Sequence, residues 1–333
     1  MSQREKQASS RPRHALVTGG AGFIGSHLCE LLLAQGWRVT AVDDLSTGSI
    51  ANVRVAERDP RFRLYVSSAD DEALLKGLAA DADVIFHLAA VVGVRKVMES
   101  AVGTIERNLH TTETVLKVAN LFRLRLLLTS TSEVYGANPR ESFREDDDSI
   151  IGNSRHRRWA YAAGKLLDEF HAFAYYYSSS LPVTVVRLFN TIGPRQVGQY
   201  GMVVPTFVSQ ALAGRPITVH GDGSQRRSFT YVLDVVRCLY ELAVRPEAAG
   251  QVYNIGSDQE ISVMDLALKV KAMTASSSEV VRQSYQEVFG ESFVDMERRR
   301  PDVSKLRAAI GYAPDTPLDA MLKAVIEDLR ASK

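Results

Sequence analysis

Cysteine and long apolar runs are both scarce in this sequence. Only two cysteines occur among its 333 residues, and Cys29 and Cys238 both lie in apolar patterns typical of helices. Buried thiols are therefore expected, rather than a disulfide or a metal site. No apolar stretch approaches the roughly 20 residues that a membrane span requires. Residues 1–13 lack the apolar core of a signal peptide and are expected to form a flexible tail. These absences favour a cytoplasmic protein that does not contact a membrane.

An excess of charge of one sign is also lacking. The 40 Lys and Arg residues and the 39 Asp and Glu residues leave a formal net charge of +1, so the chain has no general attraction to nucleic acid. The seven histidines include no pair at metal-ligand spacing, and no metal site is expected. The basic run at 155–158 is expected to be a loop that orders when a ligand binds, rather than a nucleic-acid interface.

A glycine-rich stretch near the start of the chain is the strongest positive signal. Residues 15–25 read Ala-Leu-Val-Thr-Gly-Gly-Ala-Gly-Phe-Ile-Gly, with Gly19, Gly22 and Gly25 three residues apart. The pattern predicts a strand, a tight turn and a helix, in which the missing Cβ atoms let the backbone approach a pyrophosphate at the helix N-terminus. Phe23 and Ile24 are expected to contact the same dinucleotide. Glycine turns between strand and helix are also common for steric reasons alone, so this signal needs support.

That support comes from the next expected strand, residues 37–42, which ends in Asp43 and Asp44. A carboxylate at this position accepts a hydrogen bond from a ribose 2′-hydroxyl and repels a 2′-phosphate. The sequence therefore predicts NAD rather than NADP, with Asp43 on the ribose. The following Ser46, Thr47 and Gly48 are expected to form a loop over the cofactor.

Strand-like and helical segments alternate through the first 190 residues. The strands are rich in Val, Ile and Leu, which is typical of a parallel sheet covered by helices on both faces. Strands are expected at 15–17, 37–42, 62–66, 82–90, 124–128 and 182–190, and helices at 70–80, 99–122 and 161–177. The fourth strand ends in Leu88, Ala89 and Ala90, which are expected to contact the cofactor, and its small residues allow a close approach. The fold class predicted is a doubly wound α/β (Rossmann) sheet.

The regular alternation ends after residue 190, where glycine-rich loops begin. We expect a NAD-binding domain over 14–190, to which 227–255 returns, and a smaller C-terminal α/β substrate domain. The smaller domain is expected to comprise 191–226 and 256–331, closed by helices at 262–274 and 317–331.

Tyr161 and Lys165 stand four residues apart and so share one face of the expected helix. An ammonium beside a phenol, together with a positively charged nicotinamide, favours the phenolate, so Tyr161 is a candidate to take a proton from a substrate hydroxyl. Thr131 is expected to share that hydroxyl's hydrogen bonds. In isolation such a pair is usually only an exposed helix face, and the glycine loop is what favours a functional role.

These motifs together resemble the extended short-chain dehydrogenase/reductase family, which modifies nucleotide sugars. The resemblance rests on Thr-Gly-Gly-Ala-Gly-Phe-Ile-Gly at 18–25, His-Leu-Ala-Ala at 87–90, Ser-Thr-Ser-Glu-Val-Tyr-Gly at 130–136 and the pair Tyr161 and Lys165. It extends through 187–190, 193–195 and 221–229. It implies that Asn190 and Arg227 contact the nucleotide diphosphate, and that Arg195 and Val204 also belong to the substrate site. It also implies a homodimer formed by the helices at 99–122 and 161–177.

Two positions depart from the family pattern. Gly164 stands where a serine is common before the family's lysine, and Ser67 stands where many members place an aspartate against the adenine. Neither change removes a catalytic group.

The resemblance implies a shared first step, in which Tyr161 removes the proton of the sugar 4-hydroxyl and a 4-keto sugar forms. Glu133 matches the glutamate that UDP-glucuronate decarboxylases carry in Thr-Ser-Glu, and Arg299, before Pro301, is a further decarboxylase-like feature. Its guanidinium is expected to hold a carboxylate or donate a proton. Ser132 stands where 4,6-dehydratases supply a second acid, so dehydration ranks lower.

The sequence thus favours NAD-dependent decarboxylation of UDP-glucuronate, giving UDP-xylose or a UDP-4-keto-pentose. Arg95, in Gly-Val-Arg at 93–95, resembles some uronate epimerases. C4 epimerisation of UDP-glucuronate is therefore the alternative. A non-catalytic protein that binds NAD and a nucleotide sugar is the third reading, and the intact Thr131, Tyr161 and Lys165 argue against it.

Overall fold

The computed structural model describes residues 11–91, 101–198, 201–289 and 298–331. Within these residues a seven-stranded sheet forms the centre of the larger part of the molecule, with strand order β11-β6-β5-β4-β1-β2-β3. All of its neighbouring strands pair in parallel. The strands are β1 (His14–Thr18), β2 (Arg38–Asp43), β3 (Phe62–Val66), β4 (Val84–His87), β5 (Arg125–Thr131), β6 (Val183–Leu188) and β11 (Gln251–Ile255). The predicted doubly wound sheet is confirmed.

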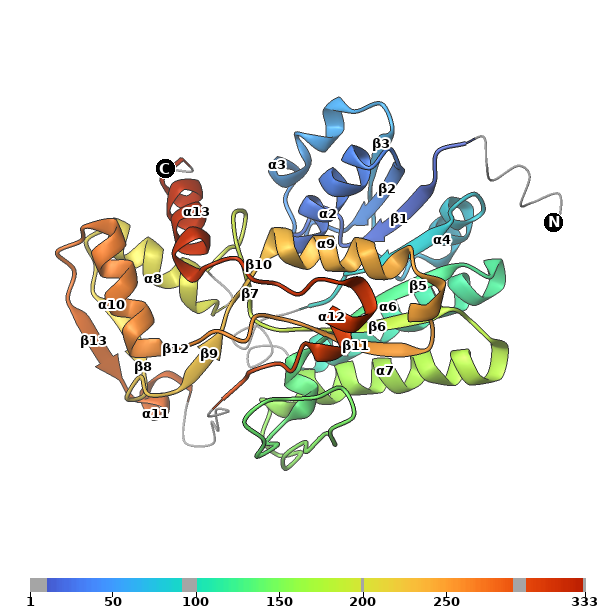
Figure 1. Cartoon of the computed structure of the whole chain (residues 1–333). Coiled ribbons are helices and arrows are strands. Elements are labelled where there is room, and N and C mark those ends of the chain that lie inside the picture. Colours follow the sequence, from blue (N-terminus) through green and yellow to red (C-terminus); the bar gives the residue numbers. More distant parts are fainter. Residues whose placement is uncertain (1–10, 92–100, 199–200, 290–297, 332–333) are drawn as a thin grey trace.

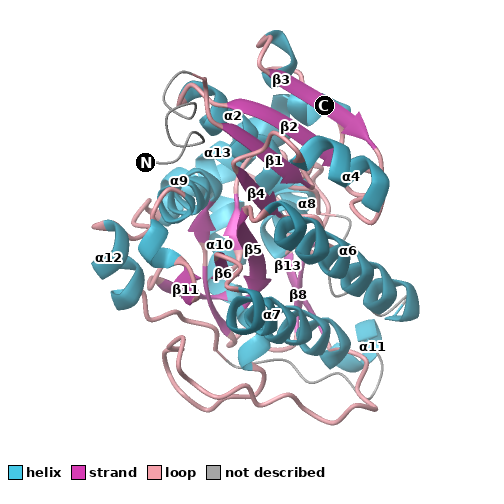
Figure 2. Cartoon of the chain, turned by 90° about the vertical axis from the view of Figure 1, so that its right-hand side faces the viewer, coloured by secondary structure: helices cyan, strands magenta, loops and turns pink. Residues whose placement is uncertain are grey.

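Helices cover both faces of this sheet (Figure 2). One face carries α2 (Phe23–Ala34), α3 (Ile50–Val53) and α9 (Val232–Ala243), and the other carries α4 (Glu72–Ala79), α6 (Ala101–Phe122) and α7 (Trp159–Ser179). Successive side chains of a strand point to opposite faces. Val17 accordingly packs into the cluster under α2 and α9, and Leu16 packs into the cluster under α4, α6 and α7. This two-sided burial explains the continuous apolar runs of the strands.

The smaller part lies to one side of the sheet, on the left in Figure 1. Its core joins α8 (Val203–Leu212), α10 (Val263–Thr274) and α13 (Leu318–Ala331) with β8 (Ile217–His220), which pairs with β13 (Val280–Gln283). Short pairs, β7 (Thr191–Ile192) with β10 (Thr230–Tyr231) and β9 (Arg226–Ser228) with β12 (Glu260–Ser262), lie where the two parts meet. Beyond β13 the chain forms the short α11 (Tyr285–Phe289).

The chain passes between the two parts more often than the expected division allows. Helix α9 and strand β11 return to the large sheet, where β11 pairs with β6. The segment around α12 (Ser304–Ile310) also packs there, because Val303, Leu306 and Ala313 join the same buried cluster as Leu239 of α9. The expected span 256–331 for the smaller domain is therefore corrected, since 303–313 belongs to the larger part.

The connections place the carboxyl ends of the central strands together. From β1 the chain leads to β2 and β3 on one side of the sheet, whereas β4, β5 and β6 follow on the other side. Doubly wound sheets bind ligands at such a reversal of strand order. Among the described residues, no helix has both the length and the apolar character needed to cross a membrane.

Candidate functional site

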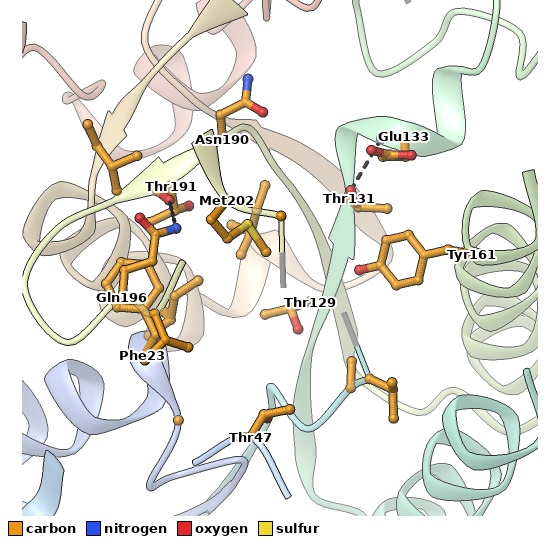
Figure 3. Close-up of a pocket in the computed structure, with 18 of the residues that line it drawn as sticks. Phe23, Thr47, Thr129, Thr131, Glu133, Tyr161, Asn190, Thr191, Gln196 and Met202 are labelled. Carbon is orange, nitrogen blue, oxygen red and sulfur yellow. Dashed lines mark hydrogen bonds between the residues drawn. The ribbon is translucent and has the colours of Figure 1, made fainter. Parts of the chain in front are cut away.

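A cavity of about 1080 Å³ lies at the carboxyl ends of the central strands, between the large sheet and the smaller part. Its wall runs from the glycine loop, past Tyr161, to α8 and Arg227. Figure 3 shows part of this wall, with the Tyr161 hydroxyl directed into the cavity beside Thr131. The cavity brings together residues that lie far apart in the sequence.

The glycine loop forms a close turn in which side chains have no room. Gly19 has a φ of +73°, and a Cβ there would lie 2.7 Å from the backbone nitrogen of Ala89. A Cβ on Gly25 would lie 2.0 Å from the Gly19 carbonyl oxygen. Helix α2 begins beyond Gly22, which as its N-cap has no side chain to bond the first backbone N–H groups. The loop thus presents backbone N–H groups and a helix N-terminus to the cavity, an arrangement suited to a pyrophosphate.

Asp43 closes the other side of this loop. Its Oδ2 accepts a hydrogen bond of 2.9 Å from the backbone N–H of Ala21, and its Oδ1 accepts one of 2.9 Å from Leu45. Burial raises the pKa of Asp43, against these hydrogen bonds. Asp44 accepts from the Arg107 guanidinium at 3.2 Å. Both acidic residues line the cavity, so this end of it carries two carboxylates.

Most of the other residues predicted for the cofactor also line the cavity, namely Phe23, Ile24, Ser46, Thr47, Leu88, Ala89 and Ala90. Two do not. Ser67 donates to Asp71 at 3.3 Å, while its neighbours Ser68 and Ala69 reach the wall. Gly48 packs behind the wall, where a Cβ would lie 2.7 Å from Asp43 Oδ1. Their expected contact with the cofactor stays a prediction.

Tyr161 of α7 and Thr131 of β5 lie side by side on the cavity wall (Figure 3). Burial raises the pKa of Tyr161 above its ordinary value, and the negative charges of Glu133 and Asp168 raise it further. The Thr131 hydrogen bond and the Arg299 charge act in the opposite direction. The surroundings of Tyr161 therefore favour the neutral phenol. That Thr131 shares the hydrogen bonds of a substrate hydroxyl stays a prediction.

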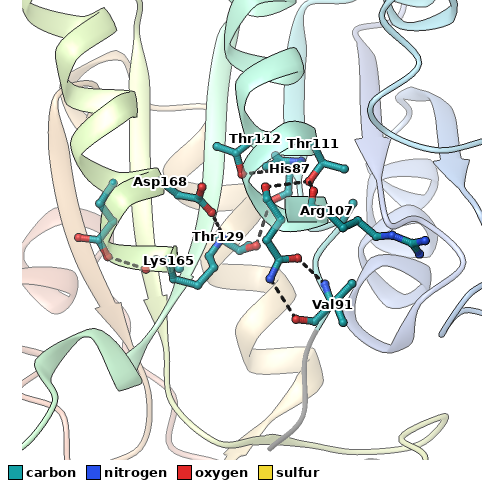
Figure 4. A network of polar contacts seen from close by, with 12 residues as sticks. His87, Val91, Arg107, Thr111, Thr112, Thr129, Lys165 and Asp168 are labelled. Atoms are coloured by element: carbon teal, nitrogen blue, oxygen red, sulfur yellow. Dashed lines mark hydrogen bonds and ion pairs between the residues drawn. The ribbon is translucent and has the colours of Figure 1, made fainter. Parts of the chain in front are cut away.

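Lys165 lines the same cavity, yet its ammonium is paired with Asp168 at 2.8 Å. Both side chains are nearly fully buried, at 3% and 1% exposure (Figure 4). The sequence predicted that Lys165 lowers the pKa of the phenol. In the structure, the carboxylate of Asp168 offsets that ammonium and itself acts on Tyr161. Asp168 was not among the predicted site residues, because it lies one layer behind the cavity wall.

Glu133 lies between two arginines. Its Oε2 accepts from Arg158 at 2.9 Å and its Oε1 accepts from Arg299 at 2.8 Å. Thr131 begins the short turn that carries Glu133, since its hydroxyl accepts from the Glu133 backbone N–H at 3.2 Å. Ser132, also predicted, is 1% exposed and lines the cavity. Thr131, Glu133, Tyr161 and Arg299 therefore meet at one end of the cavity.

Arg299 reaches this end because its loop is tied to two distant segments. The backbone of Phe143 bonds both Arg300 and Asp302, at 2.9 and 2.8 Å, and the Ser228 hydroxyl donates to the Arg299 carbonyl at 3.1 Å. The burial of Phe143 anchors the arrangement. The loop after residue 298 thus lies against β9 and the segment that follows β5.

A buried ion pair holds α7 against the sheet. Glu169 accepts from Arg187 of β6 at 2.8 Å and also accepts from the Ser130 hydroxyl of β5. The Arg187 guanidinium lies 4.7 Å from the centre of the Tyr135 ring. Because Tyr161 is on α7 and Thr131 is on β5, this pair fixes the distance between their backbones.

On the substrate side, Asn190, Val204 and Arg227 line the cavity as predicted, whereas Arg195 does not. The Arg195 guanidinium instead donates to Ser26 at 3.1 Å and to Glu30 at 2.7 Å, both on α2. Its φ of +69° turns the chain toward α2. Arg195 therefore links the loop after β7 to the larger part, and its expected place in the substrate site stays a prediction. Arg95 lies outside the described residues.

Several cavity residues were missed by the sequence reasoning, including Arg158, Gln196, Met202, His220, Phe229 and Tyr285. Arg158 was placed in a basic loop expected to order on binding. The expected helix began at Tyr161, whereas α7 begins at Trp159, directly after Arg158. The others come from segments whose folding onto the cavity depends on tertiary packing.

Comparison with known proteins gives a consistent picture. A family model described as the NAD dependent epimerase/dehydratase family matches residues 15–256. The chain is 38% identical to a UDP-N-acetyl-alpha-D-glucosaminuronate decarboxylase of Bacillus cytotoxicus, over 96% of this chain and 98% of that protein. It is 35% identical to UDP-glucuronic acid decarboxylase 1 of Danio rerio, over 95% of this chain and 72% of that protein.

A solved structure with the same fold is a UDP-glucuronic acid 4-epimerase from Bacillus cereus in complex with UDP-glucuronic acid and NAD. It is 28% identical to this chain, with a TM-score of 0.86 over 96% of this chain and 100% of that one.

Proposed function

Because the chain belongs to the NAD-dependent epimerase/dehydratase family, whose motifs its sequence carries, we propose that it is an NAD-dependent decarboxylase of UDP-hexuronates, with UDP-glucuronate as the expected substrate. The observation that carries the proposal is the cluster of Glu133, Arg158 and Arg299 beside Tyr161. Two guanidiniums at the sugar end of the cavity suit an acidic sugar. The decarboxylases among the relatives support the same choice.

The cavity fits NAD at its glycine-loop end. The glycine turn and the N-terminus of α2 line this end and suit a pyrophosphate, and the Asp43 carboxylate lines the same end, where it would accept from a ribose hydroxyl. Asp44 adds a second negative charge, which disfavours the 2′-phosphate of NADP. NAD held there supplies the acceptor and donor of the hydride at the sugar C4.

Tyr161 is the group that takes the proton of the sugar 4-hydroxyl. Its hydroxyl faces the cavity beside Thr131, whose hydroxyl would bond the same substrate oxygen. Since burial and two nearby carboxylates raise the pKa of Tyr161, ionisation depends on positive charge brought near it. Lys165 and a cationic nicotinamide provide that charge. The product of this step is a 4-keto uronate, which is a β-keto acid.

Loss of CO2 then needs no further oxidant. The bond between C5 and the carboxyl carbon breaks, its electron pair moves into the C4–C5 bond, and the ketone oxygen takes up the negative charge. The Tyr161 and Thr131 hydroxyls donate hydrogen bonds to that oxygen. A proton from water then adds at C5, with Glu133 as the acid–base group that passes it on, and restores the ketone. Reduction of this ketone gives UDP-xylose, whereas its release gives a UDP-4-keto-pentose.

C4 epimerisation of UDP-glucuronate is the second candidate, and the fold shared with the Bacillus cereus epimerase favours it. A simple epimerase has no need for an acid–base group beyond Tyr161, so the placement of Glu133 supports decarboxylation. The Bacillus cytotoxicus relative acts on a sugar with a 2-acetamido group. The 2-acetamido counterpart of UDP-glucuronate is therefore the second substrate to test.

We also propose a cytoplasmic homodimer. Helices α6 and α7 pack together, and their outer faces expose six large apolar side chains, namely Val102, Ile105, Leu121, Leu167, Phe170 and Tyr177. An apolar patch of this kind is typical of a protein interface. Cys29 and Cys238 are free and buried, and so require no oxidising compartment. Sedimentation of the purified chain tests the dimer, and a monomer at micromolar concentration contradicts it.

NMR of the purified enzyme with NAD and UDP-glucuronate tests the reaction. The anomeric and C5 proton signals are followed while released CO2 is trapped. A pentose or 4-keto pentose together with CO2 is the expected result. UDP-galacturonate without CO2 identifies a C4 epimerase instead and reduces Glu133 and Arg299 to binding roles. The same run with the 2-acetamido substrate shows which uronate is preferred.

A further inference from the structure

Arg158 occupies a position where its residue type is locally unfavourable. It directly precedes α7 with helical backbone angles, φ −53° and ψ −36°, and makes no side-chain cap hydrogen bond. The positive end of the helix dipole disfavours a cation at this place. The residue is also only 5% exposed. Conflicts between local preference and the native structure are expected at functional sites.

The guanidinium of Arg158 is held firmly at the sugar end of the cavity. It donates to Glu133 Oε2 at 2.9 Å and lies 5.0 Å from the centre of the Trp159 ring. Trp159 is itself 4% exposed and packs against Gly152, so the ring is a fixed support. Arg158 is thereby oriented before any substrate enters.

Glu133 joins Arg158 to Arg299, and the three side chains form what we call the acid clamp. The clamp carries two positive charges and one negative charge, hence a net charge of +1. A guanidinium has five N–H donors in a planar fork and can bind two carboxylates at once. The clamp lines the cavity next to Tyr161. A second carboxylate at this place is stabilised by both arginines.

We propose that Arg158 is a specificity-determining residue, which together with Arg299 receives the C5 carboxylate of the substrate while Glu133 holds the two guanidiniums apart. The inference rests on the proposed function, because it assigns the acidic group of that substrate to a site. It adds a recognition role for Arg158. A neutral nucleotide hexose brings no carboxylate, so Glu133 remains the only carboxylate in the clamp. Such a sugar gains no binding energy from Arg158.

Binding to the NAD-loaded enzyme, measured by calorimetry, tests this role with UDP, UDP-glucose and UDP-glucuronate. Wild-type enzyme is expected to bind UDP-glucuronate more tightly than UDP-glucose. In Arg158→Gln the affinity for UDP-glucuronate is expected to fall about 10- to 100-fold, the range for a lost charged hydrogen bond. Affinity for UDP is expected to stay within about twofold, since the clamp is at the sugar end. Arg158→Lys keeps the charge without the planar fork of the guanidinium. Its affinity for UDP-glucuronate is expected to lie between those of the wild type and Arg158→Gln.

The matched control is Arg157→Gln, which removes the same charge from an exposed neighbouring residue and is expected to leave all three affinities unchanged. If Arg158→Gln binds UDP-glucuronate as wild type does, or weakens UDP and UDP-glucuronate equally, the proposal is overturned. Equal wild-type affinity for UDP-glucose and UDP-glucuronate also overturns it, without any variant. Tight, Arg158-dependent binding of UDP-glucuronate with no release of CO2 leaves the inference standing and removes the decarboxylase function.

Discussion

The two ends of the cavity are built in different ways. The cofactor end is made mainly of backbone, with the glycine turn at Gly19 and the helix N-terminus after Gly22, and Asp43 braces the turn through two backbone N–H groups. The sugar end is made of charged side chains, with the acid clamp and the pair formed by Lys165 and Asp168. On the proposed function, the first end would recognise a shape common to many cofactors, and the second would select the chemistry.

This difference leads to different consequences of mutation. A backbone site is sensitive to added volume, because a new Cβ must displace main-chain atoms that cannot move independently. A site made of charges is sensitive to single atoms, because each buried charge depends on its partner. The following changes separate these two kinds of sensitivity.

The largest expected effect on the reaction is that of Tyr161→Phe. The variant lacks the group that takes the proton, so formation of the 4-keto intermediate is expected to fall by about 10²- to 10⁴-fold. Appearance of NADH absorbance with UDP-glucuronate measures this step. Binding of NAD is expected to persist, since the glycine loop is untouched. Retained oxidation in a correctly folded variant contradicts the role of Tyr161 as the base.

Glu133→Gln is expected to have a smaller effect on a later step. The amide keeps the shape but removes the charge that joins Arg158 to Arg299. Oxidation by way of Tyr161 is expected to continue, while the rate of CO2 release falls by about 10²-fold. Trapping of CO2 alongside NADH absorbance separates the two steps. An unchanged rate of CO2 release shows that the carboxylate is dispensable.

The same division explains how much the sequence predicted. Glycine spacing and the acidic end of β2 are local patterns, so the cofactor end and the parallel sheet were predicted from residues 15–44 and the alternation of segments. The cluster of Glu133, Arg158 and Arg299 joins three segments, and its assembly depends on the bonds of Phe143 to the loop near 300. A single sequence does not contain that distance information. The contacts of Arg195 could not be predicted for the same reason, since its partner Glu30 lies 165 residues earlier in the chain.

Two glycine variants test the cofactor end. A Cβ on Gly25 would lie 2.0 Å from the Gly19 carbonyl oxygen, whereas one on Gly22 would lie 3.1 Å from the same atom. Gly25→Ala is expected to destabilise the fold by about 1–3 kcal/mol and to lose NAD binding, because the turn itself must shift. Gly22→Ala is the matched control, and it is expected to lose less stability and less affinity for NAD than Gly25→Ala. Thermal unfolding and NAD titration measure the pair. Equal effects contradict the steric account.

The smallest expected effect, and the finest test of the sugar end, is that of Asp168→Asn on pH dependence. The phenol of Tyr161 faces the carboxylates of Glu133 and Asp168, which raise its pKa, and Thr131 and Arg299, which lower it. Removal of the Asp168 charge therefore lowers the pKa of Tyr161. Since the reactive form is the phenolate, the acid limb of the rate profile moves to lower pH. The asparagine keeps an oxygen for the Lys165 ammonium, which limits the cost of leaving it unpaired in the interior.

The control is Asp319→Asn, which breaks an ion pair with Lys269 whose carboxylate is 69% exposed. It removes the same charge far from the cavity and is expected to leave the profile in place. A merely structural role for Asp168 lowers thermal stability but leaves the acid limb where it was. A shift of the acid limb to higher pH in Asp168→Asn shows that the displacement of the Lys165 ammonium affects the pKa of Tyr161 more than the loss of the Asp168 charge does. The direction of the shift therefore reports whether the charge of Lys165 acts on the pKa of Tyr161, and whether the charge of Asp168 opposes it.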